Sequence, residues 1–97
     1  MRVEATARFQ AWINGLKDRA GRARILVRID RLAHGNPGEH RHLAGGISEL
    51  KIDAGPGYRV YYTQRGMNLV ILLGGGDKST QRRDIAAALA LLGSLKE

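Results

Sequence analysis

The stretch that decides the fold runs from residue 58 to residue 92 and reads YRVYYTQRGMNLVILLGGGDKSTQRRDIAAALALL. Residues 58–63 are mostly β-branched or aromatic, which is typical of a strand. Residues 69–73 are continuously apolar, which indicates a central strand covered on both faces. Residues 64–68 contain a glycine and fit a hairpin connection between these strands. From residue 79 to residue 95 apolar residues recur at helical spacing, so we expect a helix that packs on the sheet.

The preceding half of the chain adds a strand and two helices. Residues 2–6 can form a short first strand, and residues 7–17 and 22–34 carry apolar residues at helical spacing. The second helix ends at a Gly-Asn-Pro-Gly sequence, which stops helices. Residues 47–52 alternate in polarity and indicate a strand with one covered face. The predicted order is β-α-α-β-β-β-α, an α+β domain with a helical hairpin and a C-terminal helix packed on a mainly antiparallel sheet.

Composition narrows the class of protein. The 97 residues suit a single domain over the whole chain, and 43% hydrophobic residues exclude a disordered tail. The absence of cysteine excludes a disulfide framework and a thiolate metal site. Since no apolar run is long enough to cross a bilayer, we expect a cytoplasmic protein without a membrane partner. The net charge of +7 favours a polyanionic partner such as nucleic acid or the ribosome, or an acidic protein.

The glycines at 74–76 raise the question of a phosphate-binding loop. A P-loop needs the pattern G-x-x-x-x-G-K-[ST], in which backbone N–H groups surround the phosphates ahead of the lysine. Here Asp77 precedes Lys78, and a carboxylate in that place would repel phosphate. We therefore expect the glycines to let the backbone turn off the sheet, so that the polar and cationic residues that follow face an anion. These residues are Lys78, Gln81, Arg82 and Arg83.

Two pieces of this region, GYRVYY at 57–62 and LLGGGDKSTQ at 72–81, carry a family resemblance. Together with residues 15–50, they resemble the small toxins of the RelE/ParE superfamily, in particular the HigB-like addiction module killer group. The resemblance covers nearly the whole chain. It implies a RelE-like fold, no cofactor, and the toxin of a type II toxin–antitoxin module. Such a toxin is held inactive by a cognate antitoxin, which we expect to be a helix-turn-helix protein from the adjacent gene.

Many members of that superfamily are endoribonucleases that cleave mRNA in the ribosomal A site, through attack of a ribose 2′-OH on the next phosphate. The resemblance implies that Arg59 and Lys51 act at the scissile phosphate. It also places Lys78, with Arg82 beside it, near a second basic position of the family. Tyr61 shares a strand face with Arg59 and could stack on a base. The predicted catalytic residues are Arg59, Lys51 and Lys78, and the predicted RNA-binding residues are Arg82, Tyr61 and Gln81.

The resemblance leaves proton transfer unassigned. RelE-like enzymes tend to have a tyrosine or histidine late in the chain, whereas residues 81–84 read QRRD. Glu39, His40 or His42 could supply the proton transfer, because they precede the first strand of the meander. The two histidines in a strand would present both rings on one face. With no cysteine and only Glu39 nearby, however, we expect no metal site.

Each predicted site residue also has a purely structural interpretation. Arg59 could pair with Asp53 or Asp77, and Lys51 could protect a sheet edge. Tyr61 could simply cover the sheet. Two other functions also remain open. One is a ParE-type toxin that poisons DNA gyrase without nuclease activity, and the other is a binding module that represses its own promoter with its antitoxin. In either toxin an acidic antitoxin segment is expected to cover the basic face.

Overall fold

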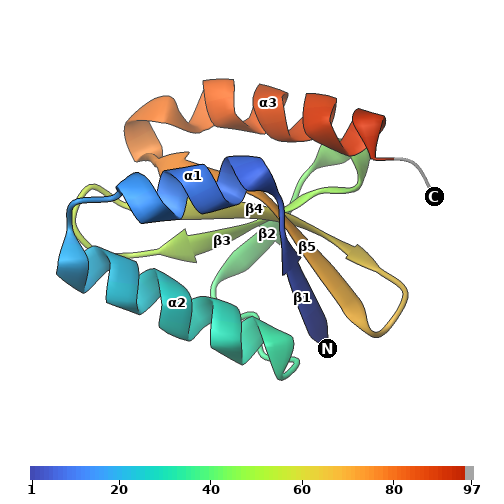
Figure 1. The fold of residues 1–97 in the computed structure, drawn as a ribbon, viewed down its shortest axis with the longest axis horizontal. Helices are drawn as coiled ribbons and strands as arrows, with labels where there is room; N and C mark the ends of the chain where they lie inside the picture. The colour runs from blue at the N-terminus through green and yellow to red at the C-terminus, as the bar shows by residue number, and fades with distance from the viewer. Residues whose placement is uncertain (96–97) are drawn as a thin grey trace.

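The computed structural model describes residues 1–95. Within them, five strands form one sheet between helices that cover both of its faces (Figure 1). The predicted α+β class and order of elements are confirmed, with one strand added. In chain order the elements are β1 (Arg2–Ala5), α1 (Ala7–Gly15), α2 (Arg19–Ala33), β2 (His40–His42), the 3₁₀ turn η1 (Ala44–Gly46), β3 (Ser48–Ile52), β4 (Tyr58–Arg65), β5 (Leu69–Asp77), the 3₁₀ turn η2 (Lys78–Thr80) and α3 (Gln81–Ser94).

The strands lie in the order β1-β5-β4-β3-β2. Neighbouring strands are antiparallel except β1, which pairs in parallel with β5. The apolar first half of β5 therefore has a partner on each side, as its sequence predicted. The added strand, β2, reads His-Arg-His and is exposed throughout. Because it has no apolar face, only its pairing with β3 reveals it.

The sheet separates two hydrophobic cores, one on each of its faces. On one face, α1 and α2 pack against the sheet, with Ile25 and Leu50 both fully buried. On the other face, α3 packs against it, with Ala88 over Tyr61. Glu49 and Leu50 point to opposite faces of β3, and each has an exposed fraction of 0%. The prediction that this strand has one covered face was therefore wrong, because its alternating pattern contains a buried carboxylate rather than a solvated one.

The three glycines do not turn off the sheet, which corrects the expectation from sequence. Residues 74–76 continue β5 as far as Asp77, and their backbone stays in the extended region. Glycine is needed here because other side chains press on the strand. A Cβ on Gly75 would overlap the ring of Trp12, and a Cβ on Gly76 would overlap the carboxylate of Asp84. The glycine run therefore marks the place where α1 and α3 approach the end of the central strand.

The helix boundaries follow from capping. α2 begins at Arg19 because the Asp18 carboxylate accepts a hydrogen bond from the N–H of Gly21, at 3.0 Å. The start predicted at residue 22 was therefore too late. α1 ends at Gly15, before the predicted end at residue 17. None of the helices in residues 1–95 is long and apolar enough to span a membrane.

Candidate functional site

Three cations predicted from the sequence line one cavity. Lys51 lies on β3, Arg59 on β4 and Lys78 in η2, and the cavity between them has a volume of about 270 Å³. Sheet pairing brings them together, because Lys51 is the register partner of Arg59, while Lys78 directly follows the end of β5. We call this space the cationic cavity. Its lining residues are Glu39, Lys51, Asp53, Gly57, Arg59 and Lys78.

The cationic cavity is lined by three cations and by two carboxylates, those of Glu39 and Asp53. Lys51 and Arg59 lie directly opposite each other on neighbouring strands, and like charges in that arrangement destabilise a sheet. Lys51 Nζ lies 3.6 Å from Glu39 Oε2, and Arg59 Nε lies 3.8 Å from Glu49 Oε2. Lys78 is exposed and adds a third positive charge at the start of α3. Lys51 and Arg59 each have a carboxylate partner, so Lys78, which makes no ion pair within the described residues, is the cation most available to an anionic group such as a phosphate.

Glu49 is the buried counter-charge of this site, and sequence analysis did not select it. Its Oε1 accepts a hydrogen bond from Gln81 Nε2 at 2.7 Å, and its Oε2 lies 3.3 Å from an Arg41 guanidinium nitrogen. Within the described residues, Glu49 Oε2, Arg59 Nε and Tyr61 Oη are buried without a hydrogen-bond partner. Glu49 is two residues before Lys51 on β3, so the two side chains lie on the same face of the strand. This spacing could have identified Glu49 as a site residue from the sequence.

Arg59 is held in place from two sides. Its exposed fraction is 8%, and one guanidinium nitrogen donates to the carbonyls of Gly57 and Tyr58, at 3.2 and 3.3 Å. Its Nε faces the buried carboxylate of Glu49. Among the described residues this is the ion pair that Arg59 makes, so the predicted pairing with Asp53 or Asp77 was wrong. A guanidinium fixed in this way is preorganised for an anion that enters the cavity.

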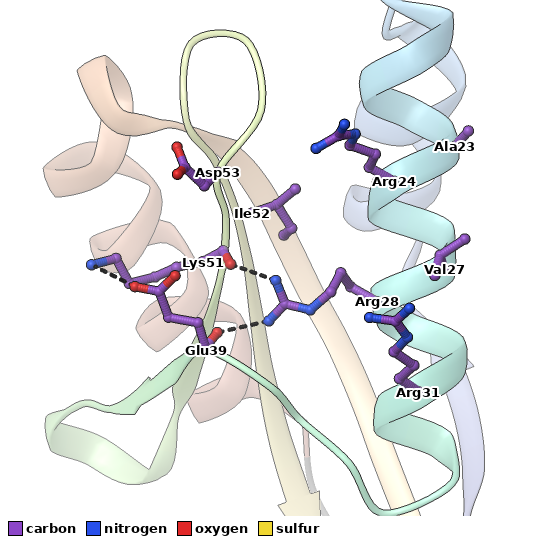
Figure 2. A pocket seen from close by; sticks show the side chains of 9 residues that line it. All are labelled: Ala23, Arg24, Val27, Arg28, Arg31, Glu39, Lys51, Ile52 and Asp53. Atoms are coloured by element: carbon purple, nitrogen blue, oxygen red, sulfur yellow. Dashed lines mark hydrogen bonds and ion pairs between the residues drawn. The ribbon is translucent and has the colours of Figure 1, made fainter.

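Arg28 of α2 fixes the backbone of Lys51 and Glu39, and it lines a separate pocket between α2 and β3. Its guanidinium donates to the carbonyl oxygens of Lys51, Glu39 and Pro37, at 2.6, 2.7 and 2.9 Å. Figure 2 shows Arg28 reaching the strand from the helix, while the side chains of Lys51 and Glu39 pair on the far side of that strand. Lys51 does not lie on a sheet edge, because its N–H donates to the Glu39 carbonyl at 3.0 Å. The interpretation of Lys51 as an edge protector was therefore wrong.

The predicted RNA-binding residues are not gathered at one place. Tyr61 is fully buried under α3, so its ring covers the sheet and is not presented for stacking on a base. Burial raises the pKa of its hydroxyl. Gln81 is bound to the buried carboxylate of Glu49. Arg82 is exposed in the first turn of α3, which follows the 3₁₀ turn that contains Lys78.

The histidines lie beside the cationic cavity and do not line it. His40 Nδ1 is 2.7 Å from the carbonyl of Gly38, and His42 Nδ1 is 2.8 Å from Ser48 Oγ. Their rings stack edge to face at 5.5 Å. In residues 1–95 no group of three or more histidine, aspartate or glutamate residues is arranged to hold a metal ion. Of the three groups proposed for proton transfer, Glu39 is the one that reaches the cavity.

Comparison with known proteins places the chain in a family. Residues 11–91 match the family model of Gp49-like phage-derived proteins (DUF891). A protein of Haemophilus influenzae, described as an uncharacterized protein, is 46% identical over 91 residues. That alignment covers 94% of this chain and 92% of the relative. The similarity therefore extends over all the elements that build the cationic cavity.

Proposed function

Because the chain belongs to the family of Gp49-like phage-derived proteins, we propose that it is the toxin of a type II toxin–antitoxin module, of the HigB-like group in the RelE/ParE superfamily. We propose further that it is a ribosome-dependent endoribonuclease that cleaves mRNA and stops translation. The observation that carries this proposal is the convergence of Lys51, Arg59 and Lys78 on one small cavity.

The geometry suits cleavage of a phosphodiester. A ribose 2′-OH attacks the adjacent phosphorus, the bond to the 5′ oxygen of the next nucleotide breaks, and a 2′,3′-cyclic phosphate forms. The phosphate gains negative charge as the bonds change, so fixed cations around it lower the barrier. Arg59 and Lys51 offer such cations from neighbouring strands. The carboxylate of Glu39, on the same cavity wall, is the candidate acceptor of the 2′-OH proton, and the departing 5′ oxygen takes its proton from water.

The partners of this toxin are a ribosome with its mRNA and a cognate antitoxin. A helix-turn-helix protein from the adjacent gene is the proposed antitoxin. An acidic segment of such a protein would pair its carboxylates with Lys78 and Lys51, which are the more accessible cations of the cavity. It would thereby exclude the scissile phosphate both by charge and by bulk.

One observation favours a second function. Residues 81–84 begin α3 beside the cavity and contain neither tyrosine nor histidine, so they offer no acid of the usual RelE type for the leaving group. A toxin without that acid could act by poisoning DNA gyrase through protein contacts. DNA damage with intact mRNA after induction would identify this activity.

The first test is cleavage of a defined mRNA by the purified protein, with and without bacterial ribosomes, mapped by primer extension. We expect cuts at A-site codons that require ribosomes. Lys51→Ala and Lys78→Ala should each lower the rate by about 10²-fold, since each removes one cation from the transition state. Lys17→Ala is the matched control, because this exposed lysine lies in the link between α1 and α2. Equal rates in all three variants would refute the assignment of the site.

A further inference from the structure

A second cavity lies at the end of β5, between α1 and the start of α3. Its volume is about 670 Å³, and we call it the tryptophan cavity. Figure 1 shows the end of β5 and the beginning of α3 alongside α1. The residues that matter for its chemistry are Arg8, Trp12, Gly75, Gly76, Thr80 and Arg83.

The floor of the tryptophan cavity is bare backbone at an open edge of the sheet. β1 pairs with β5 only from Leu69 to Leu72, and the chain then turns into α1 through Thr6. Beyond that point the edge of β5 faces side chains of α1 instead of a strand. The glycines at 74–76 carry no side chains, and Arg8, Trp12 and Asp84 pack directly on them, so a ligand in this cavity meets those side chains rather than the strand itself.

Trp12 forms one wall and is only partly buried. Part of its ring packs on Gly75, and its neighbours are Phe9 and Tyr58, with ring centroids at 5.8 and 6.4 Å. These contacts hold the indole in one orientation. A fixed and partly exposed aromatic ring is what proteins use to stack the bases of single-stranded nucleic acid.

The rim of the tryptophan cavity carries two exposed arginines from different helices, Arg8 of α1 and Arg83 of α3. The two carboxylates in the wall are already engaged. Asp77 accepts hydrogen bonds from the hydroxyl and the N–H of Ser79, which lower its pKa. Asp84 accepts one from Thr80 and lies 3.7 Å from Arg83 Nε. Both carboxylates keep their negative charge and Arg83 is paired with Asp84, so Arg8, which makes no ion pair within residues 1–95, is the cation that can meet a phosphate.

We propose that the tryptophan cavity binds one nucleotide of single-stranded RNA, with its base on Trp12 and its phosphate at Arg8. This inference rests on the proposed function, because it places a neighbouring nucleotide of the same substrate. The two cavities lie on either side of η2, since Lys78 lines the first while Asp77 and Thr80 line the second. A strand that crosses η2 would put one phosphate among the three cations and a flanking base on the indole.

The proposal can be tested with the full chain, because Trp12 is its only tryptophan. The probe is a short single-stranded oligoribonucleotide, 2′-O-methylated so that it cannot be cleaved. Titration should quench the Trp12 fluorescence, because a stacked base lies against the indole. An abasic strand of the same length and inorganic phosphate should not quench it. Equal quenching by the abasic strand would overturn the proposal, and so would no quenching by the RNA.

Variants separate stacking from charge. Measured by fluorescence anisotropy of a labelled strand, Trp12→Leu should weaken binding by about 5- to 150-fold, and Trp12→Phe should restore most of it. Arg8→Ala should weaken binding more than Arg24→Ala, an equal loss of charge at an exposed site on α2. Circular dichroism checks that each variant is folded. Equal effects of the two arginine variants, or full binding by a folded Trp12→Leu protein, would overturn the proposal.

The outcomes distinguish this inference from the function on which it rests. Base-dependent quenching without any ribosomal cleavage would keep the tryptophan cavity and refute the nuclease. Cleavage that is lost in Lys78→Ala but unchanged in a folded Trp12→Leu protein would keep the nuclease and refute the tryptophan cavity. Quenching by an acidic peptide, with none by RNA, would assign the cavity to a protein partner and would also refute the proposal.

Discussion

Gly75→Ala tests the packing that forms the tryptophan cavity. The new methyl would lie 2.7 Å from Cη2 of Trp12 and closer still to Cε3 and Cζ3, so the ring must move. Forcing a side chain into occupied space costs about 1–3 kcal/mol. The loss of glycine's freedom in the unfolded chain offsets about 0.4–1 kcal/mol of this. Because the approach to the ring is far inside contact distance, we take the upper half of that cost, about 2–3 kcal/mol. We therefore expect the free energy of unfolding to fall by about 1–2.6 kcal/mol, or the Tm by roughly 4–21 °C.

Urea unfolding followed by circular dichroism measures this change. Gly93→Ala is the matched control, because it lies in α3 with no atom within 4 Å of its new methyl, and it should be neutral or stabilising. In a Trp12→Leu background the cost of Gly75→Ala should fall by at least about 1 kcal/mol, since the overlapping ring is gone. An equal cost in both backgrounds, or a Gly75→Ala protein as stable as the wild type, would refute the reasoning.

Three further results are expected. Glu49→Gln removes the buried negative charge beside the Arg59 guanidinium. It should lower the free energy of unfolding, measured by urea titration, by about 1–3 kcal/mol. The control Glu4→Gln, at an exposed site, should leave it unchanged. The Tyr58 hydroxyl donates to Asp18 at 2.7 Å, and this hydrogen bond raises the pKa of Tyr58 to about 12. The folded state holds that proton more tightly than the unfolded chain. The stability that this hydrogen bond provides is therefore complete below roughly pH 10 and is lost as the pH rises through the raised pKa. The urea concentration at the unfolding midpoint should therefore decrease as the pH rises from about 10 to about 12. In Tyr58→Phe this decrease should be smaller. Arg28→Ala deletes three hydrogen bonds to carbonyl oxygens and should cost about 1.5–3 kcal/mol, with faster amide hydrogen exchange in β2; unchanged exchange there would contradict its role as the link between α2 and the sheet.

The class of fold and the order of elements could be predicted because they depend on local patterns. The apolar run in β5 and the helical spacing in α1, α2 and α3 read directly as the elements that form. The same local information predicted that three consecutive strands form a meander, whereas the register shift between Tyr61 and Tyr62 in the β4–β5 pairing was not predicted. Lys51 and Arg59 were selected by a motif resemblance, and sheet pairing places them opposite each other.

Tertiary packing decided what local patterns do not encode. Alternation shows which residues share a face of a strand, but it does not show what packs on that face. For this reason residues 47–52 were expected to have one solvated face, and Tyr61 was open to both stacking on a base and covering the sheet, whereas the structure buries Glu49 and Tyr61 completely. The glycines at 74–76 likewise look like a turn in the sequence. They remain in β5 because they pair with residues 59–61 of β4. They must be glycine because Trp12, more than sixty residues earlier in the chain, and Asp84 occupy the space that side chains would need.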